Sequence, residues 1–136
     1  MRHAHSLIAA LLACVLPLAA SAQTPGSEGW NPANVGQAKA QADRDEASLP
    51  PDIAQAMRAA QQDALEHGVQ ACASPKADTT PFVIVARLDA RGSIARSWRN
   101  SDTALAMCME RYLRGRTLMA PPRAPLFVSF ELSFTP

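Results

Sequence analysis

Residues 82–134 contain the pattern that most constrains the fold, because strand and helix periodicities follow one another there in a clear order. Residues 82–88 (FVIVARL) are rich in Val and Ile and alternate around one apolar face, which predicts a strand. The polar link 89–92 ends in Gly92, and glycine readily adopts the positive φ that a tight reversal needs. We therefore expect residues 93–99 to return as a second strand.

A helix and a third strand complete this pattern. Residues 102–114 carry apolar side chains at helical spacing, with capping residues at 100–102 and Gly115 as the stop. In residues 126–134 (LFVSFELSF), apolar side chains occupy every second position. This alternation predicts a strand whose apolar face includes Val128, Phe130 and Leu132.

An earlier helix is predicted over residues 52–72, opened by Pro50 and Pro51 and stopped by Ser74-Pro75. The chain then reads α-β-β-α-β, an α+β fold in which two helices cover the apolar face of a three-stranded antiparallel sheet. Apolar residues on both faces of 82–88 predict that this strand is central, which leaves 126–134 on an edge.

Three short segments stand out within roughly residues 52–134: Leu88-Asp89-Ala90-Arg91-Gly92, Asn100-Ser101-Asp102 and Leu118-Met119-Ala120-Pro121-Pro122. Together with the order of the elements, these segments resemble the C-terminal periplasmic domain of the TonB/TolA family. The resemblance implies a TonB/TolA C-terminal-like domain over 51–136 that binds partners by strand addition. One departure is that family members keep an N-terminal membrane helix and a long spacer, which we do not expect here once the leader is removed.

The N-terminus predicts export. Residues 1–22 have a basic start, an apolar stretch and the small-x-small site Ala20-Ser21-Ala22, as in a secretory signal peptide, so we expect a soluble periplasmic protein beginning at Gln23. The apolar stretch is shorter than a membrane span needs, although an uncleaved anchor is the alternative. A second alternative is a lipoprotein anchored at Cys14, because Leu11-Leu12-Ala13-Cys14 resembles a lipidation signal.

After cleavage two cysteines remain, and an exported chain with two cysteines favours one disulfide, Cys72–Cys108. Residues 23–50 are poor in large apolar groups and are expected to be disordered, with Trp30 as a solvent-exposed tail tryptophan or, less favoured, a docking residue.

Charge is distributed unevenly. Residues 23–78 hold four basic and eight acidic side chains, whereas residues 79–136 hold eight arginines and four acidic side chains. The hairpin arginines and Trp98 suggest a partner-binding surface, although a solvated face is slightly favoured. The near-neutral net charge of +1 and the expected compartment argue against nucleic-acid binding.

Nothing in the sequence predicts catalysis, a metal or a cofactor. His67 lies near a helix end, where a structural role explains it, and the serines lack a nucleophile motif. Asp89 and Asp102 occupy turn and cap positions. Two of the four mature methionines, Met57 and Met109, fall on core stripes, which argues against a copper site. We expect a protein that is not an enzyme.

The strongest functional feature is the final edge strand, because an exposed edge can accept an extended peptide through main-chain hydrogen bonds. We expect a non-catalytic envelope protein that binds another envelope protein or peptide. The alternatives are a structural or accessory envelope protein without peptide binding, and, less favoured, a small periplasmic hydrolase or inhibitor. The predicted partner-binding residues are Phe127, Ser129 and Glu131 on the edge strand and Arg96, Trp98 and Arg99 on the hairpin.

Overall fold

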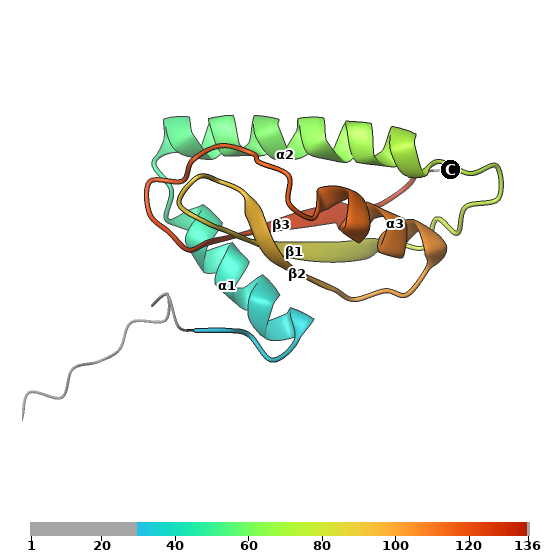
Figure 1. Ribbon diagram of the computed structural model, residues 1–136, viewed down its shortest axis with the longest axis horizontal. Coiled ribbons are helices and arrows are strands. Elements are labelled where there is room, and N and C mark those ends of the chain that lie inside the picture. Colours follow the sequence, from blue (N-terminus) through green and yellow to red (C-terminus); the bar gives the residue numbers. More distant parts are fainter. Residues whose placement is uncertain (1–29, 136) are drawn as a thin grey trace, which may run out of the picture.

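The structure is a computed structural model that describes residues 30–135, and within them the fold is α+β (Figure 1). The elements in chain order are α1 (Val35–Ala47), α2 (Pro51–Cys72), β1 (Phe82–Leu88), β2 (Ile94–Arg99), α3 (Ala104–Leu113) and β3 (Leu126–Leu132). Their types confirm the α-β-β-α-β order predicted for residues 52–134, and α1 is an additional helix.

The three strands form one antiparallel sheet in the order β2-β1-β3, which confirms that β1 is central and β3 is an edge strand. Gly92 adopts a φ of 83° in the hairpin link, as expected for a reversal. The Asp89 carboxylate accepts the main-chain N–H groups of Arg91 and Ser93 in this turn. These hydrogen bonds, first that of Ser93, lower the pKa of Asp89.

The main core lies between one face of the sheet and the helices α2 and α3. β1 contributes the alternate residues from Phe82 to Leu88, and β3 contributes those from Leu126 to Leu132, so the observed faces follow the predicted alternation. Met57 on α2 and Met109 on α3 are buried in the same core, where they fill space between the helices and the sheet.

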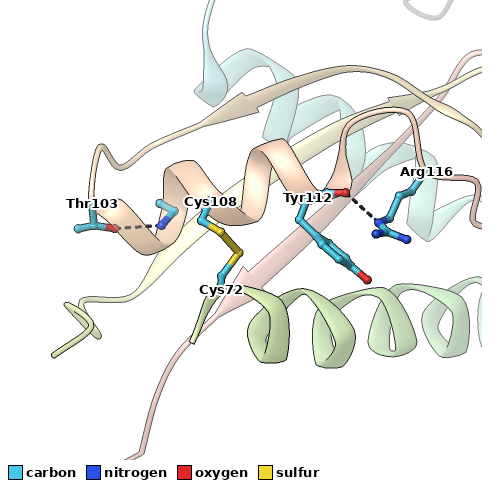
Figure 2. The surroundings of a disulfide bond; sticks show 6 residues. Cys72, Thr103, Cys108, Tyr112 and Arg116 are labelled. Carbon is cyan, nitrogen blue, oxygen red and sulfur yellow. Dashed lines mark hydrogen bonds between the residues drawn. A yellow bond between two sulfur atoms is a disulfide. The ribbon is translucent and has the colours of Figure 1, made fainter. Parts of the chain in front are cut away.

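The Cys72–Cys108 disulfide is confirmed. It joins the last residue of α2 to the middle of α3, with sulfur atoms 2.08 Å apart (Figure 2). The helical stripes therefore place the two cysteines against each other, as the sequence predicts.

The expectation of a disordered segment over 23–50 is wrong for residues 35–47, which form α1. This helix covers the face of the sheet opposite α2 and α3, so three helices rather than two cover the sheet, on both faces (Figure 1). Its small buried side chains, Ala38 and Ala42, let the helix approach large residues of the sheet closely. The Asn34 side chain caps α1 by accepting the Gln37 N–H at 3.0 Å.

Two predicted boundaries differ by a few residues. α3 begins at Ala104, because Thr103 is the residue whose hydroxyl caps it, whereas Asn100 uses its side chain to accept the Val83 N–H. β3 ends at Leu132 rather than at residue 134.

The expected signal peptide, its alternative anchor and the lipidation candidate Cys14 all lie outside the described residues. Across 30–135, no helix combines the length and the apolarity that crossing a membrane would require.

Candidate functional site

The outward edge of β3 is the candidate binding site, and the register decides which of its main-chain groups face away from the sheet. Val83 directs its N–H and C=O toward Asn100 at the β2 side, so the alternate residues of β1, such as Ala86, pair with β3. Their partners include Val128, which leaves the N–H and C=O groups of Phe127, Ser129 and Glu131 directed outward.

The first outward group is bound by a side chain of α1. The Phe127 N–H donates to Oδ2 of Asp45 at 2.9 Å, in a buried position. The other carboxylate oxygen, Oδ1, accepts from Gln41 at 2.9 Å and from Arg123 at 2.9 Å. Asp45 is 5% exposed, and these donors satisfy its buried charge.

The second outward residue is bound from two helices. The Ser129 N–H donates to Glu46 Oε1 at 3.4 Å and its hydroxyl to Oε2 at 3.2 Å, while its C=O accepts from Gln61 of α2 at 3.0 Å. Gln61 also donates to Glu46 at 2.8 Å. Burial raises the pKa of Glu46, and the hydrogen bonds from Gln61 and Ser129 oppose that shift.

The third outward residue is more open. The Glu131 side chain is 60% exposed and pairs with Lys39 of α1 at 2.8 Å. Within residues 30–135, no hydrogen bond reaches its outward main-chain groups. Beside it lies a groove of about 500 Å³ between α2 and the end of β3, with Leu65, Val69 and Phe134 among its apolar walls.

The other predicted edge and hairpin aromatics are not exposed, which corrects the expectation that they form an accessible surface. Phe127 is 1% exposed and Trp98 is 9% exposed, because α1 covers both. The Trp98 indole N–H donates to the Pro32 carbonyl at 3.2 Å. Trp30, expected to be a solvent-exposed tail residue, is partly buried and packs edge-on against Phe127 with ring centroids 5.7 Å apart.

The hairpin arginines do not gather on one face. Arg96 stacks over Trp98 at 5.0 Å, on the α1 side of the sheet. Arg99 lies on the opposite side, where it pairs with Glu110 of α3 and with Asp102. Ser97 also donates to Glu110, at 2.9 Å. The single arginine-rich surface predicted from the hairpin is therefore divided between the two faces.

Elsewhere, a polar hollow of about 570 Å³ lies between α2 and the residues that follow α3, where Tyr112 and Arg116 face α2 (Figure 2). Its rim includes His67, whose Nδ1 lies 2.9 Å from the Asp63 carbonyl and 3.4 Å from its carboxylate. Both side chains are largely exposed. Among the residues that the structure describes, no group of three or more His, Cys, Asp or Glu side chains could hold a metal.

The sequence interpretation missed Asp45, Glu46 and Gln61, the residues that bind the β3 edge. Asp45 and Glu46 lie in the last turn of α1, where the helix dipole disfavours acidic side chains, so this signal can be read only once the helix is known. The edge of β3 explains their positions, because both carboxylates accept its outward main-chain N–H groups.

Comparisons with protein-family models, with curated proteins and with solved structures gave no match to this chain.

Proposed function

We propose that this chain is an exported, non-catalytic envelope protein whose TonB/TolA-like domain binds another envelope protein by accepting an extended segment along β3. The observation that carries the proposal is the state of that edge. The outward N–H groups of Phe127 and Ser129 and the Ser129 C=O are paired with side chains, and no hydrogen bond reaches the outward groups of Glu131 within the described residues. Such an edge retains the capacity to pair with a strand.

The groove between α2 and β3 supports the same function. A strand that pairs with Glu131 would place alternate side chains on the α2 side of the sheet, beside Leu65, Val69 and Phe134. Main-chain hydrogen bonds would then supply affinity, and this apolar groove would select the side chains.

Export is supported by the Cys72–Cys108 disulfide, because such bonds persist in oxidising compartments. A periplasmic location and cleavage after residue 22 are part of the proposal. Mass spectrometry of the protein purified from a Gram-negative periplasm tests both. A chain starting at Gln23 is expected, whereas a diacylglyceryl group on Cys14 would establish the lipoprotein alternative.

Photocrosslinking tests partner binding. A photoreactive residue at Ser133, an exposed position beside the groove, should capture an envelope protein in the periplasm. The same residue at Gln55, an exposed position on α2 that is not among the groove's lining residues, is the matched control. Equal capture at both positions would contradict recognition at the β3 edge.

The purified partner then allows a sharper test. Ser129→Pro removes an outward N–H and should abolish binding, whereas Ser129→Ala keeps that N–H and should change affinity little. A folded Ser129→Pro protein with unchanged affinity would exclude pairing at this residue.

A structural or accessory role is the second candidate, and the covering of Phe127 and Ser129 by α1 and α2 favours it. If the edge is covered only to prevent aggregation, neither photoreactive position should capture a specific protein.

A further inference from the structure

The attachment of α1 permits it to leave the sheet as one body. Its apolar contacts belong to a small cluster with Val85, Trp98 and Phe127, separate from the core that α2 and α3 share. The chain connects its C-terminal end to α2 through residues 48–50, where Leu49 packs in the main core, and the Gln61 amide of α2 donates to Glu46 at 2.8 Å. A rotation about this link that breaks the Gln61–Glu46 hydrogen bond would uncover the outward N–H groups of β3 while the main core stays packed.

The side chains on the edge reproduce the pairing of a strand. Carboxylate oxygens of Asp45 and Glu46 accept the N–H groups of Phe127 and Ser129, which are two residues apart, as carbonyl oxygens of a neighbouring strand would. The Gln61 amide donates to the Ser129 carbonyl, as a strand N–H would.

These contacts are not arranged for maximum stability of the helix. Both carboxylates lie in the last turn of α1, where the helix dipole is unfavourable to anions. Glu46 is also partly desolvated, as its raised pKa indicates. Release of α1 would return the Glu46 carboxylate to water, which offsets part of the contacts that are lost.

We propose that α1 and a partner strand compete for the same main-chain groups of β3, so that α1 closes this edge until the partner displaces it. The inference rests on the strand-binding function proposed above and adds its regulation. The geometry of the competing contacts carries it, because both occupants use the outward N–H groups of Phe127 and Ser129.

The uncovered surface defines the partner chemically. Departure of α1 exposes Phe127 and Trp98 on one face, while the α2 groove accepts side chains on the other. The matching partner is an extended segment with apolar side chains on both faces. An acidic residue in it would also compensate Arg123, which loses Asp45 when α1 leaves.

The first experiment measures opening without any partner, by amide hydrogen exchange in the mature chain. Ala42→Asp places a charge against the aromatic cluster and should release α1, whereas Ala40→Asp makes the same change at an exposed position of the helix. We expect Ala42→Asp to speed exchange at Phe127 and Ser129 by about tenfold or more relative to Ala40→Asp. Exchange at Val128 and Phe130, whose N–H groups face β1, should change by less than about twofold.

The second experiment uses a labelled peptide copying residues 126–134, with lysines added at both ends for solubility, as an extended apolar probe. It should bind Ala42→Asp about tenfold or more tightly than the Ala40→Asp control. Adding Ser129→Pro to Ala42→Asp should remove this binding. A bis-maleimide link between cysteines that replace Lys39 and Glu131 should hold α1 against β3. This link should also prevent binding of the probe.

The outcomes separate the two proposals. If exchange at Phe127 and Ser129 rises only together with exchange at Val128 and Phe130, α1 is an inseparable part of the fold and the competition is refuted. If the selective exchange is observed but the probe binds no variant, release of α1 stands and strand binding fails. If the probe binds Ala42→Asp and Ala40→Asp with equal affinity, α1 does not compete for the edge.

Discussion

At the scale of single residues, Glu46 illustrates how a contact can satisfy the edge of a sheet and still cost stability. Because its pKa is raised in the folded protein, the folded state binds its proton more tightly than the unfolded chain does. Its contribution is therefore most favourable below the pKa of the unfolded chain. It is lost as the pH rises through that value and then through the raised pKa of the folded state.

Replacing this carboxylate by an amide tests that sign. Glu46→Gln keeps an oxygen for the Ser129 N–H and removes the partly buried charge, so at about pH 7 the variant should be at least as stable as the wild type. Near pH 3 the difference should shrink, since Glu46 is then protonated in both states. Urea unfolding at the two pH values measures it, with the exposed Glu66→Gln as control. A clear loss of stability in Glu46→Gln at about pH 7 would contradict this interpretation.

Two glycines with positive φ make a matched pair. A Cβ added at Gly92 (φ 83°) would lie 2.0 Å from the Met119 carbonyl oxygen, whereas one added at Gly115 (φ 75°) would meet nothing within 4 Å. Gly115→Ala should therefore cost about 1 kcal/mol, from its conformation alone. Gly92→Ala should cost well over about 2 kcal/mol, because main-chain atoms must move. Thermal unfolding of both variants provides the measurement, and equal losses would contradict this difference.

At the scale of elements, proline substitutions distinguish the two sides of β3. Ser129 directs its N–H outward to Glu46, and Val128, opposite Ala86, directs its N–H toward β1. Ser129→Pro should cost about 1–2 kcal/mol, whereas Val128→Pro should cost about 3 kcal/mol or more because it breaks the ladder. Circular dichroism and chemical unfolding measure both, and similar losses would mean that the register has been assigned wrongly.

The elements predicted from the sequence were those whose own periodicity identifies the buried face. Residues 82–88 and 126–134 alternate regularly, and residues 52–72 repeat at helical spacing, so their types and the central place of β1 followed from local pattern. The helix α1 could not be recognised this way. Its buried face consists of Ala38, Ala42, Gln41 and Asp45, and only the aromatic residues of the sheet make that face a packing surface.

The same omission explains the errors at the candidate site. Phe127 lies on the face of the sheet away from the main core, as the alternation predicts. Without knowledge of α1, a residue on that face is predicted to be exposed and available for binding. The division of Arg96 and Arg99 between two faces follows from strand alternation, but their partners Trp98 and Glu110 come from different layers of the fold. Tertiary neighbours therefore decided what each side chain does.

At the scale of the whole molecule, the sheet separates two apolar clusters of unequal size. The larger one lies under α2 and α3, where the Cys72–Cys108 disulfide joins these two helices, and the smaller lies under α1. Such a small domain has limited surface to bury, so a covalent link between two helices of its main core should contribute a large part of its stability.

Removing that link should show its contribution. The bonded cysteines are 36 residues apart in sequence, and closing a loop of this length in the unfolded chain corresponds to about 4 kcal/mol. The free energy of unfolding of the double variant Cys72→Ala, Cys108→Ala should therefore be about 3–4 kcal/mol lower than that of the wild type. The fraction of the variant that folds should retain native secondary structure. Urea unfolding provides the measurement, and the wild type under reducing conditions should match the double variant to within about 1 kcal/mol. If both keep the stability of the oxidised protein, packing of α2 against α3 holds the core without the disulfide, and the bond contributes little to the free energy of unfolding.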